Sequence, residues 1–193
     1  GPTSFASKKP IRTLADFKGQ KIRVLATKME STLVGKFGAA GVPIPYTEVL
    51  PALQRGTIDA VRSSIIVMGG SKFFTVTKFI TVVESGMIPS AVLLSDVWLK
   101  KLSGKQRGFV TKTLSDMSDW NNDTAATFGK NAEKLWSDNG AEVIRLSAAD
   151  QKSFLDTVRP LGDEFLGNHK NEGVRKMYGL LKASARSNMK MMK

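Results

Sequence analysis

Short blocks of hydrophobic residues alternate with amphipathic blocks along the first third of the chain. Residues 21–26, 42–46 and 57–62 are short and rich in aliphatic or β-branched side chains, so each is predicted to form a strand. Between them, residues 31–40 and 48–55 carry apolar side chains at helical spacing, and a glycine follows each stretch. Strands that alternate with helices in this way are typical of a right-handed parallel α/β unit.

The rest of the chain is predicted to be mainly helical. Ser103 and Gln106 have the spacing of a capping box, which opens a long helix. The polar run 121–123 is expected to interrupt this helix, and Asn139-Gly140 is expected to end it. Thr13 and Asp16 form a similar pair ahead of a short helical turn. The other predicted helices cover residues 65–74, a stretch from 147 that bends or breaks near Pro160, and 172–185; the other strands cover 79–83, 91–95 and 143–146.

The composition excludes several kinds of chemistry. The 193 residues contain no cysteine and one histidine, His169, so disulfides, thiolate metal sites and a catalytic cysteine are absent and a histidine-dependent triad is not expected. No phosphate-binding lysine loop, nucleophile elbow or metalloprotease motif occurs. No apolar run approaches the ~18 residues of a membrane-spanning helix. We therefore predict no cofactor, no metal and no enzymatic activity.

The charge of the chain favours anionic ligands without identifying one. Twenty-nine Lys and Arg against seventeen Asp and Glu give a net charge of +12. The excess is spread evenly, since residues 1–97 carry 12 − 6 = +6 and residues 98–193 carry 17 − 11 = +6. A nucleic-acid-binding protein usually concentrates its charge on one face. Only the tail is densely basic, and its one aromatic residue is Tyr178, so we predict no binding to nucleic acid.

Arg23 is the residue whose position is most unusual. It occupies the middle of a predicted strand, and alternation sends its side chain to the face opposite Ile22 and Val24. Either the strand is an exposed edge and Arg23 points into water, or its guanidinium binds an anion such as a carboxylate through two parallel hydrogen bonds. Because ligands of open α/β sheets bind beyond the carboxyl ends of strands, Tyr46 and Ser63 are the expected companions of Arg23.

Five stretches of the chain, taken in order, resemble one protein family. They are 10–24 (Pro-Ile-x-Thr-Leu-x-Asp-Phe-Lys-Gly-x-Lys-Ile-Arg-Val), 41–43 (Gly-Val-Pro), 47–59 (Thr-Glu-Val-x-x-Ala-Leu-Gln-x-Gly-x-Ile-Asp), 72–79 (Lys-Phe-Phe-x-Val-x-Lys-Phe) and 98–103 (Trp-x-x-x-Leu-Ser). Together they resemble the solute-binding proteins of tripartite ATP-independent periplasmic (TRAP) transporters, the DctP-like family. The glutamate-valine block is the most specific part, and the resemblance covers most of residues 10–166.

The resemblance implies a fold, a function and a location. The fold is an α/β, periplasmic-binding-protein-like domain with a mainly parallel sheet flanked by helices, plus long C-terminal helices. The function is capture of a small organic acid in the periplasm and its delivery to the permease subunits of a TRAP transporter. Arg23 matches the arginine that clamps the ligand carboxylate, and Tyr46 matches an aromatic position against the ligand. Ser63 matches a polar position that is often asparagine, which leaves the identity of the acid open.

The resemblance also implies a division of the chain. Residues 1–12 are expected to be an N-terminal extension or a tag remnant, and 13–104 the ligand-binding second domain of the family. Residues 105–193 are expected to form a helical region that packs on a first domain in longer members. On this interpretation the chain is a truncated form that binds ligand weakly by itself. Its exposed apolar surface is then expected to be covered by self-association or a swap of helices.

Two other functions remain open from the residues alone. One is an α/β enzyme that acts on an anionic substrate, although no nucleophile–base pair is evident in the sequence. The other is a basic α/β interaction domain that binds nucleic acid or acidic surfaces through its tail, and a steep salt dependence of binding would identify it.

Overall fold

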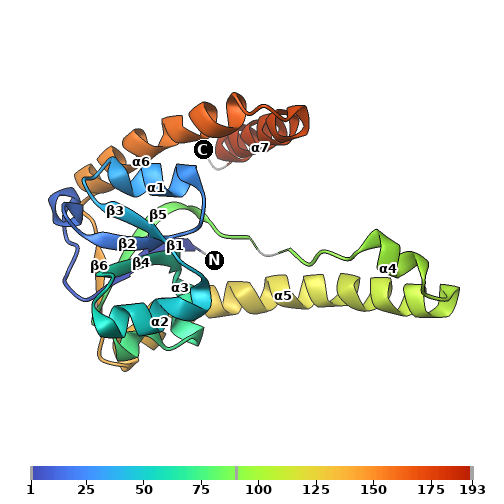
Figure 1. Cartoon of the computed structure of the whole chain (residues 1–193), viewed down its shortest axis with the longest axis horizontal. Coiled ribbons are helices and arrows are strands. Elements are labelled where there is room, and N and C mark those ends of the chain that lie inside the picture. Colours follow the sequence, from blue (N-terminus) through green and yellow to red (C-terminus); the bar gives the residue numbers. More distant parts are fainter. Residues whose placement is uncertain (1, 90, 192–193) are drawn as a thin grey trace. The chain divides into compact units, whose positions relative to one another are not determined.

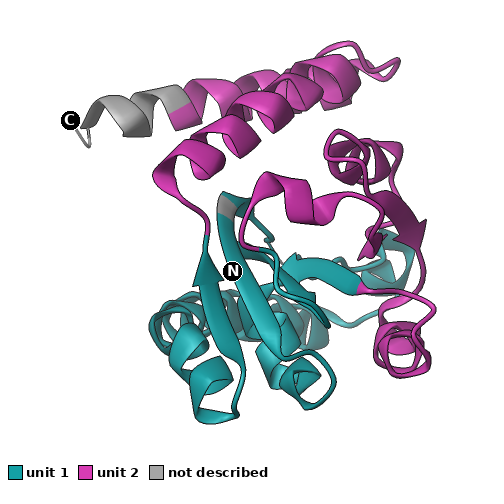
Figure 2. Ribbon diagram, turned by 90° about the vertical axis from the view of Figure 1, so that its left-hand side faces the viewer, with its two compact units in different colours: residues 1–11, 60–145 teal, residues 12–59, 146–193 magenta. Residues whose placement is uncertain are grey.

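The structure is a computed structural model that describes residues 2–89 and 91–191. The chain forms two compact units (Figure 2). Unit 1 contains residues 1–11 and 60–145, and unit 2 contains residues 12–59 and 146–193. Each unit is therefore built from two separate stretches of the sequence.

Unit 1 contains four neighbouring strands. Their order across the sheet is β4 (Ala60–Ser64), β1 (Pro2–Ser7), β5 (Phe79–Met87) and β6 (Glu142–Arg145). β1 runs antiparallel to both of its neighbours, and β5 and β6 are parallel. Phe5 lies in register with Arg62 on one side and Thr81 on the other, and its side chain is fully buried. β1 is thus the central strand of this unit's core.

The position of β1 changes two expectations. The α/β class is confirmed, but the sheet is mixed rather than mainly parallel, because an antiparallel strand lies between β4 and β5. That strand lies inside residues 1–12, the stretch that was expected to be an extension or a tag remnant. Gly1, the first residue of that stretch, lies outside the described residues. The sequence did not predict β1 because its Ser and Thr residues interrupt the apolar alternation that is typical of a strand.

The helices of unit 1 are α3 (Ile65–Gly70), α4 (Asp96–Lys100) and α5 (Gly104–Asp138), with a short 3-10 turn at Phe73–Thr75. α3 packs on the end of α5, where the fully buried Trp136 donates its indole N–H to the carbonyl oxygen of Ile65 at 3.3 Å. The ring of Phe74 meets Trp136 edge-on at a centroid distance of 5.8 Å. The predicted strand over 91–95 is absent: these residues form no ladder in the structure, and all but Leu94 are exposed.

α5 is a single helix of 35 residues (Figure 1). It begins at the predicted capping box, where the amide of Gln106 donates to Ser103 Oγ at 3.3 Å and the amide of Ser103 donates to Gln106 Oε1 at 3.0 Å. The run 121–123 does not interrupt it. Asparagine and aspartate have only modestly poor helix propensity, and their side chains here extend into solvent rather than competing for the backbone.

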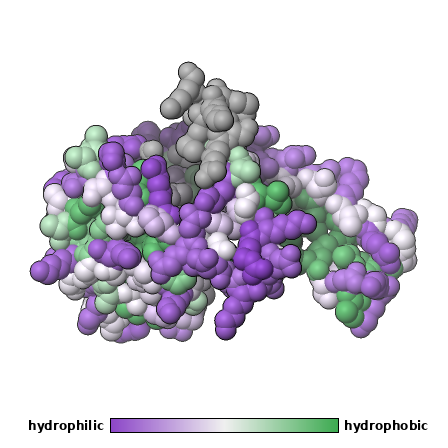
Figure 3. Space-filling model, turned by 90° about the horizontal axis from the view of Figure 1, so that it is seen from above, coloured by the Kyte–Doolittle hydropathy of each residue, from purple (hydrophilic) through white to green (hydrophobic). Residues whose placement is uncertain are grey.

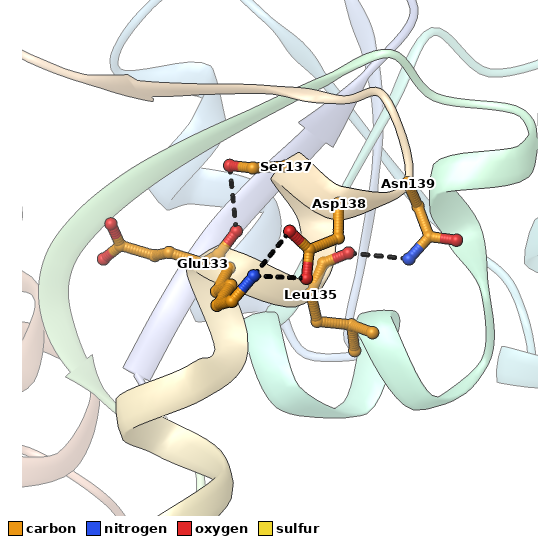
Figure 4. Close-up of polar contacts among 6 residues, drawn as sticks. Glu133, Leu135, Ser137, Asp138 and Asn139 are labelled. Carbon is orange, nitrogen blue, oxygen red and sulfur yellow. Dashed lines mark hydrogen bonds and ion pairs between the residues drawn. The ribbon is translucent and has the colours of Figure 1, made fainter.

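The C-terminal end of α5 is closed by local contacts (Figure 4). The Asn139 side-chain amide donates to the Leu135 carbonyl at 2.8 Å, and Ser137 Oγ donates to the Glu133 carbonyl at 3.2 Å. Lys134 and Asp138 form an ion pair at 2.7 Å in the last turn. Gly140 then takes φ = 77°, a left-handed conformation that glycine adopts without steric cost, and the helix stops there as predicted.

Unit 2 contains the parallel strand pair β2 (Lys21–Val24) and β3 (Ala40–Pro43), connected by α1 (Lys28–Gly35). This is the strand–helix–strand arrangement that the sequence predicts. The 3-10 turn Leu14–Phe17 precedes it and is capped as expected, since the Thr13 amide donates to Asp16 Oδ2 at 2.8 Å.

The remaining helices of unit 2 are α2 (Tyr46–Arg55), α6 (Ala148–Gly162) and α7 (Glu172–Met191). α6 continues through Pro160 and passes into a π-helical turn at Asp163–Gly167, so the predicted disturbance is a change of helix type close to that proline. A cluster of three phenylalanines fixes α6 in this unit. Phe154 stacks on Phe37 at 4.6 Å between ring centroids, and both contact Phe17.

Candidate ligand-binding site

Arg23 lies on β2 and is buried. Its neighbours Ile22 and Val24 are fully buried on the opposite face, and Arg23 itself is only 5% exposed. The exposed edge-strand alternative is therefore wrong. Removing a guanidinium from water costs free energy unless other groups compensate the charge, so the partners of Arg23 decide what the site can do.

Two residues that follow β3 contact the guanidinium. Nε of Arg23 donates to the carbonyl oxygen of Ile44 at 3.1 Å. The guanidinium carbon lies 5.7 Å from the centre of the Tyr46 ring, within the range of a cation–π contact. The structure therefore brings together two of the three predicted site residues, Arg23 and Tyr46.

The position of Tyr46 differs from the expectation in one respect. The sequence places it at the end of a strand over 42–46, whereas β3 ends at Pro43 and Tyr46 is the first residue of α2. Pro45 at the N-cap explains the change, because its extended conformation (ψ = 147°) ends the strand direction and starts the helix at the next residue. The ring of Tyr46 is thereby held at a helix start, beside the β2 arginine.

An acidic residue that the sequence analysis missed also influences Arg23. Glu30 is buried in α1, with 8% of its surface exposed. Burial lowers the pKa of Arg23 from its usual value, while Tyr46 and Glu30 act in the opposite direction by favouring the charged form. The spacing of Thr27 and Glu30 is the sequence signal for this residue, because a threonine followed three positions later by a glutamate is typical of a helix start. In the structure, the Glu30 amide donates to Thr27 Oγ1 at 3.2 Å.

The outer part of the guanidinium is the part available for a ligand. Among the residues that the structure describes, the side chain of Arg23 makes one hydrogen bond, through Nε, and its two Nη groups make none. These two groups carry four N–H donors in one plane, the arrangement that matches the two oxygens of a carboxylate. The site can therefore bind a small anion next to an aromatic ring.

Ser63, the third predicted site residue, lies on β4 in unit 1. It is 8% exposed and lies in register with Ser4 of β1. It is the penultimate residue of its strand, whereas the sequence predicts that the strand ends at residue 62. Its contact with a ligand stays a prediction.

Two kinds of feature are absent from the described part of the chain. Residues 2–89 and 91–191 contain no cluster of three or more metal-ligating side chains. No helix in those ranges combines the length and the apolar character needed to cross a membrane.

Comparison with known proteins identifies the kind of protein that the chain resembles. Residues 1–168 match the sequence model of DctP, described as bacterial extracellular solute-binding protein, family 7. Among curated relatives, the 2,3-diketo-L-gulonate-binding periplasmic protein YiaO of Escherichia coli is 30% identical over 155 residues, which are 79% of this chain and 46% of that protein. The sialic acid-binding periplasmic protein SiaP of Vibrio cholerae is 27% identical over 168 residues, 87% of this chain and 51% of SiaP.

A solved structure agrees with these relatives. The TRAP periplasmic solute-binding protein from Shewanella oneidensis with bound succinate superposes with a TM-score of 0.81 at 26% identity, over 92% of this chain and 58% of that one. The chain thus spans about half the length of the curated relatives it matches.

Proposed function

We propose a function that proceeds from one premise: the chain belongs to the DctP family, the bacterial extracellular solute-binding proteins of family 7. It is the ligand-capturing component of a TRAP transporter, and its ligand is an organic acid. The observation that carries this proposal is the buried guanidinium of Arg23, which lies beside the Tyr46 ring and whose Nη groups make no hydrogen bond with the described residues.

Arg23 is the proposed carboxylate clamp. Its bond from Nε to the Ile44 carbonyl fixes the plane of the guanidinium, so both Nη groups are oriented before the ligand arrives. A carboxylate that accepts two parallel N–H bonds gains about 1.5–3 kcal/mol from each. The Tyr46 ring covers one side of the guanidinium and offers an apolar surface to the carbon atoms of the acid.

The class of ligand follows from chemistry that the relatives share. The names of the two curated relatives specify 2,3-diketo-L-gulonate and sialic acid, and the solved relative holds succinate. All three are carboxylic acids of different size and polarity. A carboxylate clamp on β2 would serve all three acids, while the other residues that line the site would differ with the size and polarity of the ligand.

The proposal also assigns roles to Ser63 and to the two parts of the chain. Ser63 supplies a hydroxyl donor to the same acid, and its short side chain favours a ligand group that approaches closely or a bridging water. Residues 13–104 act as the ligand-binding domain, and 105–193 as the helical region that packs on a first domain in the whole protein. The protein acts in the periplasm, passes its ligand to permease subunits and does not convert it chemically.

Titration calorimetry with a series of carboxylic acids tests the clamp. We expect the chain to bind at least one acid, such as succinate or a sugar acid, and not the corresponding neutral amide. Arg23→Ala should weaken binding by about a hundredfold or more, because two charge-assisted hydrogen bonds are lost. Since that loss places a weak complex beyond calorimetry, NMR titration at millimolar ligand provides the second readout.

The matched control is Arg55→Ala. Arg55 is an exposed arginine at the end of α2 in the same unit, so its removal lowers the net charge equally without touching the proposed clamp. Binding should be unchanged in this variant. Equal affinities of wild type and Arg23→Ala would remove Arg23 from the site, and equal losses in both variants would show a general charge effect instead of a clamp.

A further inference from the structure

The two ends of α5 have different surroundings. Hydrophobic residues are exposed where α4 and the start of α5 lie (Figure 3), and in the whole protein this end is proposed to pack on a first domain. The other end is anchored in unit 1 by the buried Trp136. It is followed by Asn139-Gly140, the only asparagine–glycine pair in the sequence. Each of the other six asparagines precedes a residue that has a side chain.

An asparagine–glycine pair loses ammonia without an enzyme. The backbone nitrogen of the glycine attacks Cγ of the asparagine, the bond from Cγ to Nδ2 breaks, and ammonia leaves with the proton that the backbone nitrogen loses. Water then opens the cyclic imide to aspartate or isoaspartate, and nothing is oxidised or reduced. Glycine favours this attack because it has no Cβ to obstruct the nitrogen and its backbone rotates freely. Asparagine is accordingly one of the thermolabile residues.

In the folded chain, separate hydrogen bonds hold the two reacting groups. Nδ2 of Asn139 donates to the Leu135 carbonyl at 2.8 Å (Figure 4), while the backbone N–H of Gly140 donates to the Ser137 carbonyl at 3.0 Å. Ring closure needs the Gly140 nitrogen on the side of the Asn139 Cβ, whereas ψ = 17° at Asn139 places it next to that residue's own backbone nitrogen. The turn therefore has to open before the attack.

The turn is tied to the core of unit 1 through Trp136. The backbone amides of Asn139 and Ala141 both donate to the Trp136 carbonyl, at 3.2 and 3.1 Å. The indole of Trp136 is fully buried and donates to the Ile65 carbonyl at 3.3 Å. Opening the turn releases bonds to a residue that the core fixes, so the free energy of this local opening slows the reaction. Asn139 itself is exposed, so water for the second step reaches it.

We propose that Asn139 is a deamidation site that reacts only when the end of α5 opens, and that the reaction destroys the helix cap. Aspartate at this position has no side-chain N–H to donate to the Leu135 carbonyl. It also adds a negative charge beside Asp138 at the C-terminal end of the helix, where the helix dipole disfavours it. Isoaspartate lengthens the main chain by one carbon immediately before Gly140. Both products therefore destabilise this end of unit 1.

Peptide mass spectrometry after incubation in mildly alkaline buffer measures the rate of the reaction. In urea, Asn139 should be the first asparagine to react. In the folded chain, its reaction should be slower by about tenfold or more at the same pH and temperature, because the unfolded chain has no closed turn. Equal rates in buffer and in urea would overturn the dependence on opening. Faster reaction of another asparagine in urea would overturn the assignment of the site.

A pair of tryptophan variants tests the role of the core. Trp136→Phe loses the bond to Ile65, so the rate in the folded chain should rise at least about threefold while the rate in urea stays unchanged. Trp120→Phe is the matched control on the exposed part of the same helix, and neither rate should change. Circular dichroism verifies that both variants are folded during the incubation. A folded Trp136→Phe that reacts at the wild-type rate would contradict the proposal.

Asn139→Asp imitates one product and tests the loss of the cap. Its thermal midpoint should lie a few degrees below that of the wild type, because a hydrogen bond is lost and a charge faces the helix dipole. Asn121→Asp is the control, since it makes the same change of charge in the middle of the same helix, and its midpoint should fall less. Equal midpoints of the two variants would overturn the proposed effect on the helix end.

Discussion

Two tryptophans of the same helix experience opposite environments. Trp136 is fully buried, hydrogen-bonded to Ile65 and in edge-on contact with Phe74, whereas Trp120 is 64% exposed. The C-terminal part of α5 is therefore held by the core of unit 1. The preceding part depends on its capping box, its helix propensity and its i,i+4 ion pair between Lys112 and Asp116.

The difference shows where the stability of α5 originates. Local terms contribute a few tenths of a kcal/mol each, and an isolated helix is marginal in water. A buried tryptophan contributes several kcal/mol. The core end therefore anchors the helix, and the exposed end is free to provide a surface. Matched substitutions at the two ends of α5 should therefore have different effects on the free energy of unfolding.

The largest expected change in stability comes from replacing Trp136, and the same substitution at Trp120 is the comparison. Trp136→Ala leaves a cavity and removes the hydrogen bond from the indole to the Ile65 carbonyl, and should lower the free energy of unfolding by about 3–5 kcal/mol. Trp120→Ala should change it by less than about 0.5 kcal/mol when measured by urea denaturation at concentrations where the chain is monomeric. Similar losses for both variants would show that the forward half of α5 is packed against the unit after all.

A medium effect tests how closely α3 packs on the core end. A Cβ at Gly69 would lie 3.0 Å from Leu135 Cδ2 and 3.3 Å from the indole nitrogen of Trp136. Gly69→Ala should therefore cost about 1–3 kcal/mol of stability. The adjacent Gly70 has nothing within 4 Å of its Cβ direction, and Gly70→Ala should be neutral or slightly stabilising in the same thermal denaturation measurement. A destabilised Gly70 variant beside a neutral Gly69 variant would refute this packing.

The smallest effect compares glycines at the two ends of α5. Gly140→Ala forces a Cβ into the left-handed region at φ = 77° and should destabilise unit 1 by about 1 kcal/mol. Gly108→Ala adds a methyl group in open space near the helix start, and should increase helicity and stability by up to about 1 kcal/mol. Circular dichroism at 222 nm during denaturation measures both. Opposite signs are required, and a stabilised Gly140 variant would contradict the described helix end.

The features that sequence analysis predicted well are local. The Thr13–Asp16 and Ser103–Gln106 pairs lie within one turn of the backbone they cap, and both caps are present. The parallel strands around α1 followed from apolar spacing. The central strand β1 was missed because its burial depends on β4 and β5, which are more than 50 residues away and give no local signal.

The candidate site was predictable only in part, because some of its contacts come from residues distant from Arg23 in the chain. Alternation identifies Arg23 as the odd residue of its strand, but periodicity alone left open whether its side chain enters water or a buried site. Its burial, its bond to Ile44 and the influence of Glu30 arise from elements that follow β2 in the chain. The family resemblance supplied the role proposed for Arg23, and the geometry supplies the physical reason for it.

A crystal structure of the chain with its tightest-binding carboxylic acid tests the central claim most directly. The measured quantity is the distance from the carboxylate oxygens to the guanidinium nitrogens of Arg23. We expect the Nη groups to donate two hydrogen bonds of about 2.7–2.9 Å, with the carbon atoms of the acid against the Tyr46 ring. An acid bound at another place, with the Nη groups of Arg23 left without a ligand contact, would contradict the account.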